Sequence, residues 1–287
     1  MVNASEIYTT LVSGAQLARH LADPRWVIID CRFNLLAPQA GGADYAQAHL
    51  PGARYAHLDR DLAGPIAPGT GRHPLPDPEA LVVRLGGWGV DPETQVVVYD
   101  DCGGAIAVRL WWMLRWLGHP AVAVLDGGLA AWQAVGLSVN STTPHPVTTR
   151  FEIELQVGSQ LSMEQVRAGL RAGSICLVDA RTAARFAGEV EPIDPVAGHI
   201  PTALNYPYEA NLTSAGRFLA PELLRTRFAS LASQPERVVH MCGSGVTACH
   251  NLLAMEVAGL TGSKLYAGSW SEWVRDPRNP VATGDEA

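Results

Sequence analysis

The chain contains two copies of one unit, and this repeat constrains its fold more than any single segment does. Three motif pairs define the repeat: Asp30-Cys31-Arg32 with Asp179-Ala180-Arg181, His49-Leu50-Pro51-Gly52-Ala53 with His199-Ile200-Pro201-Thr202-Ala203, and Gly127–Trp132 with Gly268–Trp273. Motifs that recur in the same order at nearly constant separation indicate a duplicated structural unit. We therefore expect two domains of the same fold.

Each copy has the pattern of an α/β domain. Short apolar runs predict strands in the first copy at Trp26–Ile29, Val96–Tyr99 and Val122–Leu125, and in the second at Ile175–Val178, Arg237–Met241 and Lys264–Tyr266. Helical patterns lie between the strands, notably Ala105–Leu117 and Ala248–Ala258. Strands that are apolar throughout and separated by helices are typical of a mostly parallel sheet flanked by helices on both faces.

The repeat and the composition together set the domain boundaries. We expect an N-terminal domain over residues 8–138, a polar, proline-bearing linker over 139–158, and a C-terminal domain over 159–280. The net charge of −7, without any cluster of basic residues, argues against a nucleic-acid partner. No apolar run is long enough to span a bilayer. The five cysteines lack the spacing of a disulfide framework, which favours a reducing cytoplasm. The cysteines and histidines also lack the spacing of metal ligands, so we expect no metal site.

One cysteine stands where a nucleophile is expected. Cys242 follows a predicted strand and opens a short loop of small residues, Gly243–Thr247, before a long apolar helix. A helix N-terminus and free backbone N–H groups favour an anion, so this thiol is expected to ionise more readily than a free cysteine. The segment predicts a nucleophilic cysteine loop.

The repeat separates structural residues from catalytic candidates. Cys242 aligns with Asp101, so the first copy is expected to be inactive, and the neighbouring Cys102 is one position late. Arg185 aligns with Leu36, which makes it a cation found only beside the cysteine. A guanidinium can bind an anionic substrate, and we assign this role to Arg185.

Other charged and aromatic positions occur in both copies. Arg32 and Arg181, like His49 and His199, are shared by the two halves and are interpreted as structural. Cys249 is interpreted mainly as a small buried side chain, with a redox role as the alternative.

These motifs resemble the rhodanese superfamily of sulfurtransferases in its tandem form, with an inactive N-terminal and an active C-terminal domain. The similarity covers roughly residues 11–277, and Cys242-Gly-Ser-Gly-Val-Thr-Ala248 is similar to the loop of 3-mercaptopyruvate sulfurtransferases. The resemblance implies an enzyme that moves sulfane sulfur from 3-mercaptopyruvate or thiosulfate to cyanide or a thiol. The sulfur is carried as a persulfide on Cys242.

The resemblance also implies particular site residues. Ser244, His73 and Asp59 match a proton relay, and Gly243, Gly245, Val246 and Thr247 match the loop that binds the persulfide. No metal or organic cofactor is implied, and a thioredoxin-like protein is a candidate reductant. The family's second substrate arginine is missing from 189–197, and no cation follows Cys242, so the donor stays open with a preference for mercaptopyruvate.

Two other functions fit parts of the pattern. A cysteine phosphatase related to this fold requires an arginine six residues after its cysteine, where this chain has Ala248. A non-catalytic interaction module is the alternative from another class, and the retention of Cys242 with Arg185 in one half speaks against it.

Overall fold

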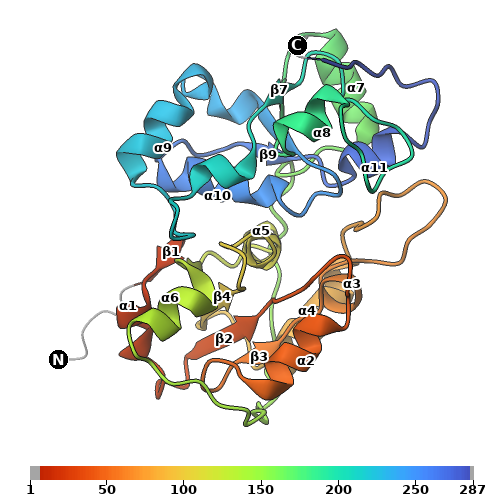
Figure 1. Cartoon of the computed structure of the whole chain (residues 1–287). Coiled ribbons are helices and arrows are strands. Elements are labelled where there is room, and N and C mark those ends of the chain that lie inside the picture. The colour runs from red at the N-terminus through yellow and green to blue at the C-terminus, as the bar shows by residue number, and fades with distance from the viewer. Residues whose placement is uncertain (1–6, 285–287) are drawn as a thin grey trace. The chain divides into compact units, whose positions relative to one another are not determined.

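The computed structural model describes residues 7–284, which form two compact units (Figure 1). The first unit contains the residues up to Leu62 together with Pro76–Gln156. The second contains Ala63–Leu75 together with the residues from Val157 onward. One short segment of the first half of the chain therefore belongs to the second unit.

The first unit is a five-stranded parallel sheet in the order β1-β5-β4-β2-β3. Its strands are β1 (Leu11–Val12), β2 (Trp26–Asp30), β3 (Arg54–Tyr55), β4 (Gln95–Tyr99) and β5 (Val122–Leu125). Its helices are α1 (Gly14–Ala18), α2 (Ala40–Gln47), α3 (Leu58–Asp61), α4 (Pro78–Gly87), α5 (Ala107–Trp116) and α6 (Gly128–Ala134).

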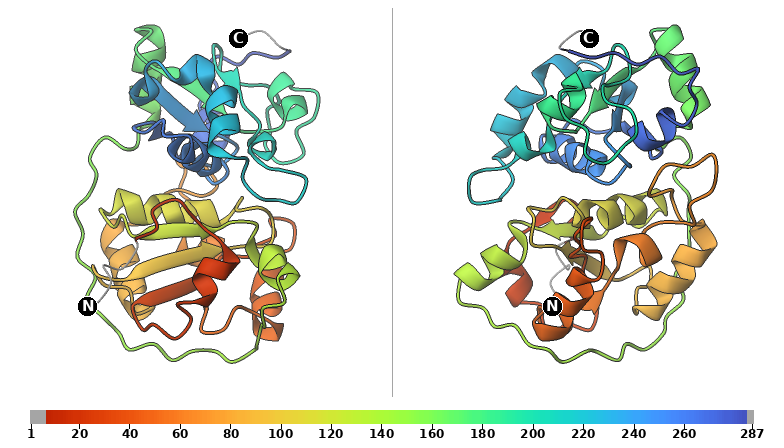
Figure 2. Two further views of the ribbon diagram at one scale, coloured as in Figure 1. Left: turned by 90° about the vertical axis from the view of Figure 1, so that its left-hand side faces the viewer. Right: turned by 45° about the vertical axis from the view of Figure 1, so that its right-hand side comes forward.

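Both faces of this sheet are covered, as the unbroken apolar runs predict. Every residue of β2 and β4 is buried. Alternate strand residues such as Ile28 and Val97 pack with Leu17 of α1 and Trp132 of α6 in one cluster. Helices lie on the two sides of the strands in Figure 2. This is the layered arrangement that parallel strands require.

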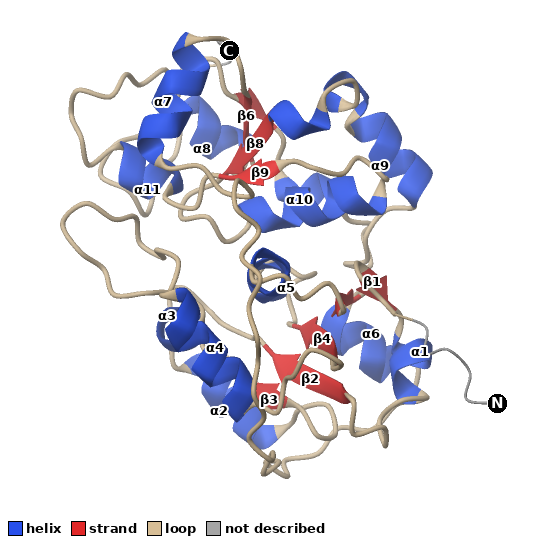
Figure 3. Cartoon of the chain, turned by 180° about the vertical axis from the view of Figure 1, so that it is seen from behind, coloured by secondary structure: helices blue, strands red, loops and turns tan. Residues whose placement is uncertain are grey.

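The second unit repeats the architecture with a four-stranded parallel sheet in the order β7-β6-β8-β9. Its strands are β6 (Cys176–Asp179), β7 (Leu204–Asn205), β8 (Val238–Met241) and β9 (Lys264–Leu265). Its α-helices are α7 (Met163–Arg171), α8 (Ala183–Ala187), α9 (Pro221–Arg227), α10 (Ala248–Val257) and α11 (Ser269–Trp273), and its 3₁₀ helices are η1 (Tyr208–Asn211), η2 (Ala229–Leu231) and η3 (Pro235–Arg237). Figure 3 shows the strands of each unit with helices around them.

The division between the units differs from the predicted boundaries. Residues expected in the linker extend along the first unit: the Thr149 hydroxyl donates to the Val90 carbonyl at 2.6 Å, and the Glu154 N–H donates to the Leu117 carbonyl at 3.0 Å. These hydrogen bonds order a polar stretch that its composition alone marks as a connection. Within residues 7–284, no helix has both the length and the apolar character needed to cross a membrane.

Candidate functional site

The Cys242 loop joins the end of β8 to the start of α10. Cys242 is buried, and the backbone N–H of Gly245 donates to its Sγ at 3.1 Å. The N–H of Cys242 itself donates to the Ser269 hydroxyl at 3.1 Å. The sulfur is therefore an acceptor from the main chain at the N-terminal side of a ten-residue helix. This geometry suits a thiolate or a persulfide anion.

The loop requires a glycine at position 245. Gly245 has φ 76°, and a Cβ there would lie 2.2 Å from the carbonyl oxygen of Ala267. A larger residue could adopt neither this backbone conformation nor this close approach without strain. The N–H that contacts Cys242 Sγ depends on this turn.

Helix α11 fixes the other side of the loop. The N–H groups of Trp270 and Ser271 donate to the carbonyls of Cys242 and Gly243 at 3.0 and 2.9 Å. Ser269 has φ 55°, and its buried hydroxyl also donates to the Tyr266 carbonyl at 2.9 Å. Because the loop carbonyls are bound by α11, the loop presents N–H rather than C=O groups to the sulfur.

Ser244 and His73 lie together although they are far apart in the sequence. His73 Nδ1 is 2.7 Å from Ser244 Oγ, and both side chains are buried. The segment 63–75 carries His73 to this place, where the Arg72 N–H donates to Ser271 Oγ at 3.0 Å. Gly71 allows the approach, because a Cβ there would lie 2.5 Å from the Gly268 carbonyl oxygen. The catalytic role of the pair stays a prediction.

Asp59, the third predicted member of the relay, lies on α3 of the first unit. Its backbone N–H donates to His57 Nδ1 at 3.1 Å, which caps the short helix. The pairing of Asp59 with His73 stays a prediction.

Arg185 faces the cysteine loop from α8. A Cβ built on Gly243 would lie 3.5 Å from Arg185 Nη1, so the guanidinium lies beside the residue that follows the nucleophile. Its Nε and Nη2 donate to Glu191 at 3.2 and 2.7 Å, and Nη2 is 3.3 Å from Asp194. The predicted substrate cation is therefore at the site, with part of its donor capacity taken by two carboxylates.

Arg72 is a second cation that the sequence analysis did not identify. A Cβ on Gly243 would lie 2.9 Å from Arg72 Nη2, and Arg72 Nη1 forms an ion pair with Asp194. It lies next to His73 in the sequence, but nothing in that local pattern indicates contact with a loop about 170 positions later. Arg72 supplies a positive charge that the segment 189–197 lacks.

The two carboxylates differ in their electrostatics. Burial raises the pKa of Asp194, an effect that its contact with Arg72 opposes. For Glu191, burial acts in the same upward direction, but hydrogen bonds from Arg185 and from the N–H groups of Asp194 and Ile193 lower its pKa overall. Glu191 is thus held firmly as an anion, whereas Asp194 is less well compensated.

The other predicted loop residues lie in the same turn between Cys242 and α10, and their binding of a persulfide stays a prediction. Gly243 and Val246 are buried, and Thr247 begins α10 without a side-chain cap. Cys249 is buried in the first turn of α10, and its thiol donates to the Gly245 carbonyl at 3.5 Å. This contact supports the structural interpretation of Cys249. Among residues 7–284, no cluster of three or more potential metal ligands is present.

Comparison with protein families identifies both units. The model of the rhodanese-like domain matches residues 13–135 and 162–276. The chain belongs to the rhodanese family. The expected fold, two tandem rhodanese domains with parallel sheets, is confirmed.

Similar proteins extend over the whole length. A protein of Pseudomonas aeruginosa named "Probable 3-mercaptopyruvate sulfurtransferase" is 49% identical and covers 96% of this chain and 98% of its own. The thiosulfate sulfurtransferase of Mus musculus is 33% identical, with 97% of both chains covered. Among solved structures, the 3-mercaptopyruvate sulfurtransferase SseA from Escherichia coli matches with a TM-score of 0.80 at 32% identity, covering 92% of this chain and all of that one. These names are of enzymes, so a non-catalytic interaction module is not favoured.

The motifs shared by both rhodanese domains have structural roles, as predicted. Arg32 and Arg181 each form an ion pair with the aspartate two residues earlier, at 2.7 and 2.6 Å. Each also donates to the carbonyl of the residue before the histidine that both halves share. His49 and His199 stack on aromatic rings and bond a nearby carbonyl through Nδ1. We therefore interpret these side chains as structural groups at the edge of the sheet and not as catalytic groups.

In the first rhodanese domain, the loop that follows β4 is bound by a carboxylate of the same loop. The Asp100 side chain accepts four backbone hydrogen bonds, at 2.8–3.0 Å, from Cys102, Gly104, Ile106 and Ala107. The predicted alignment of Cys242 with Asp101 is corrected by one position: Asp30 pairs with Tyr99 as Asp179 pairs with Met241, so Asp100 follows its strand where Cys242 follows the other. The carbonyls of Asp100 and Cys242 also accept equivalent N–H groups, from Leu129 and Trp270. Asp101 lines a separate polar pocket of about 330 Å³ with Cys102 and Arg32. Limited solvation and the neighbouring carboxylates raise the pKa of the Cys102 thiol. The catalytic inactivity of this domain stays a prediction.

We therefore expect the Cys102→Ser variant to keep wild-type turnover within about twofold, since a thiol with a raised pKa is a poor nucleophile at neutral pH. Steady-state sulfur transfer to cyanide measures this directly. A large loss of activity in a variant with an unchanged melting temperature would refute the inactivity of the first rhodanese domain.

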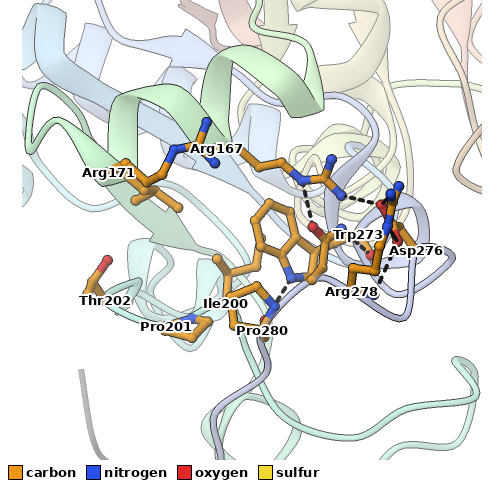
Figure 4. Close-up of a pocket in the computed structure, with 11 residues that line it drawn as sticks. Arg167, Arg171, Ile200, Pro201, Thr202, Trp273, Asp276, Arg278 and Pro280 are labelled. Atoms are coloured by element: carbon orange, nitrogen blue, oxygen red, sulfur yellow. Dashed lines mark hydrogen bonds and ion pairs between the residues drawn. The ribbon is translucent and has the colours of Figure 1, made fainter.

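The second rhodanese domain also has a cavity that does not include the cysteine loop. It has a volume of about 510 Å³ and lies between α7, the residues that precede β7, and the end of α11 (Figure 4). Arg167 spans its wall, bonded to Asp276 and Asn279, while the Trp273 indole donates to the Pro280 carbonyl. None of the predicted catalytic residues lines this cavity.

Proposed function

We propose that this protein is a sulfurtransferase that carries sulfane sulfur as a persulfide on Cys242, with 3-mercaptopyruvate as the preferred donor. The main support is the geometry at one atom. Cys242 Sγ accepts the Gly245 N–H, and two guanidinium groups lie beside the adjacent Gly243. Main-chain donors stabilise the anionic sulfur, and the arginines can bind the carboxylate of the donor.

In the first half-reaction, the Cys242 thiolate attacks the sulfur of the donor. With 3-mercaptopyruvate, an S–S bond forms, the C–S bond breaks, and its electron pair stays on carbon as the enolate of pyruvate. The proton of the donor thiol ends on that carbon, so the products are pyruvate and the persulfide anion. With thiosulfate, the leaving group is sulfite and no proton is needed.

In the second half-reaction, an acceptor removes the outer sulfur. Cyanide or a thiolate attacks it, the S–S bond breaks, and thiocyanate or a new persulfide leaves while Cys242 returns as the thiolate. The transfer requires neither metal nor organic cofactor, because sulfur itself forms the covalent intermediate. A thioredoxin-like dithiol is a suitable reductant for the released sulfur.

The preference for 3-mercaptopyruvate rests on the Ser244–His73 hydrogen bond. Cleavage of a C–S bond leaves a basic carbon that must be protonated, whereas sulfite is a stable leaving group. Ser244 lies two residues after the nucleophile, and its hydroxyl is 2.7 Å from the imidazole of His73. This buried pair can transfer the proton. A relative named for 3-mercaptopyruvate is 49% identical to this chain, against 39% for one named for thiosulfate.

We also propose a reducing compartment such as the cytoplasm. All five cysteines are free in the structure. A persulfide carrier depends on a thiol that remains reduced between turnovers.

Two measurements test the function. Incubation with a donor, followed by intact-protein and peptide mass spectrometry, should show the mass of one added sulfur on Cys242, and cyanide should remove it as thiocyanate. Steady-state rates with 3-mercaptopyruvate and thiosulfate, measured side by side, should favour the former. Absence of the adduct with both donors would refute the proposed function.

The Ser244→Ala variant should lower kcat with 3-mercaptopyruvate by about 10²-fold, the contribution typical of a positioned proton donor. Turnover with thiosulfate should fall far less, because no carbon is protonated. His73→Asn should show the same donor dependence. Equal losses with both donors would mean that the pair only supports the loop.

A further inference from the structure

Asp194 lies between the two arginines that face the cysteine loop. One carboxylate oxygen forms an ion pair with Arg72 Nη1, and the other is 3.3 Å from Arg185 Nη2. The Asp194 side chain is only 4% exposed, whereas Arg72 and Arg185 are 21% and 17% exposed. A carboxylate of the chain itself thus bridges the two cations that lie beside the cysteine loop.

Both guanidinium groups also lie beside Gly243, the residue after Cys242. A Cβ built on Gly243 would lie 2.9 Å from Arg72 Nη2 and 3.5 and 3.6 Å from Arg185 Nη1 and Nη2. Asp194 contacts Arg72 through Nη1 and Arg185 through Nη2. An anionic donor that approaches Cys242 therefore shares these two guanidinium groups with the negative charge of Asp194.

We propose that Asp194 is a specificity-determining residue that competes with the donor anion for Arg72 and Arg185. This inference rests on the proposed function. The positive charges of Arg72 and Arg185 are balanced by the negative charges of Glu191 and Asp194. When the Cys242 thiolate is added, the group as a whole is negatively charged. Each further negative charge on the donor is penalised, so dianionic thiosulfate is disfavoured more than 3-mercaptopyruvate with its single carboxylate.

Glu191 has a different role although it contacts the same arginine. Its carboxylate accepts the N–H groups of Ile193 and Asp194, both at 3.0 Å, and also lies 3.4 Å from Arg181 Nη1. These bonds fix Glu191 in its own turn. It positions Arg185 rather than competing with the donor.

The segment that carries Asp194 is anchored on both sides of it. Glu191 is fixed as described, and the Trp270 indole N–H donates to the Val196 carbonyl at 2.9 Å. The Trp270 ring in turn lies under the Arg181 guanidinium, 4.8 Å from its carbon to the ring centroid. A side-chain change at position 194 can therefore alter the charge without releasing the segment.

The test is the Asp194→Asn variant of the full chain, assayed with both donors. We expect kcat/KM to rise about tenfold for thiosulfate and about threefold for 3-mercaptopyruvate, as expected when one negative charge is removed near a doubly and a singly charged ligand. Most of the change should be in KM. The gain for thiosulfate should shrink as ionic strength increases.

Two matched variants serve as controls. Glu189→Gln removes the same charge from an exposed position in the same segment and should leave both donors unchanged. Glu191→Gln should raise KM for both donors, since Arg185 loses the carboxylate that holds both its Nε and its Nη2. If Asp194→Asn does not fold, Asp194→Ser provides a second neutral variant with the same expected shift in donor preference.

The outcomes separate the inference from the function on which it rests. The wild type should be active in this assay. If the neutral variants at position 194 have the same donor preference as the wild type, or a higher KM for both donors, Asp194 only holds the arginines in place. A wild type that forms no persulfide with either donor would refute the proposed function, and the inference with it.

Discussion

Replacement of Cys242 by serine should abolish sulfur transfer, with a fall in turnover of at least about 10⁴-fold. A serine hydroxyl is not ionised near neutral pH, and it cannot form a persulfide. The substitution is nearly isosteric, and the Gly245 N–H can still bond the oxygen, so the loop should keep its shape. Rates of thiocyanate formation and the mass of the donor-treated protein measure both steps.

Cys249→Ser is the matched control for this experiment. Its hydroxyl can still donate to the Gly245 carbonyl, as the thiol does now, so activity should be retained. A Cys242→Ser protein that still accumulates donor sulfur would place the nucleophile at another cysteine.

The Arg185→Gln variant should raise KM for anionic donors by about 10- to 100-fold, with a smaller change in kcat. This range corresponds to the loss of one charged hydrogen-bonding partner, about 1.5–3 kcal/mol. Glu191 keeps two backbone N–H groups and Arg181, so the variant should still fold. Steady-state kinetics with both donors and a thermal melt separate binding from stability.

Arg167→Gln offers a control for the loss of an arginine from an ion pair. Arg167 pairs with Asp276 at 2.6 Å and is 23% exposed, similar to Arg185, but it lines the separate cavity. Its KM values should be those of the wild type. A large drop in melting temperature for Arg185→Gln with unchanged KM would instead show that Arg185 is structural.

The strands and helices could be predicted from the sequence because each is marked by the pattern of a few adjacent residues. The repeat helped as well, because the same order of motifs appears in both halves of the chain. The predicted helix after Cys242 starts at Ala248, as expected. The predicted strand 122–125 coincides with β5, and β4 begins one residue before the predicted strand 96–99. The division of Arg32 and Arg181 from Arg185 also followed, because the repeat provided an internal comparison.

The site was less accessible to sequence reasoning because its charges are brought together by tertiary contacts. Arg72 reaches the loop through a segment that packs with the other half of the chain, and no periodicity encodes that. The absence of a cation from 189–197 was visible, but the ion pairs of Glu191 and Asp194 with the arginines were not. Likewise, Asp101 was the residue noted in the first copy, whereas the neighbouring Asp100 binds the loop.

The carboxylate of Asp100 makes the first copy of the loop self-sufficient. Four amides that would otherwise need a guest anion are saturated by a side chain of the same turn, so this loop keeps its shape at all times without any reactive sulfur. Because these amides are satisfied within the turn, the shape of this loop does not depend on a sulfur at position 102.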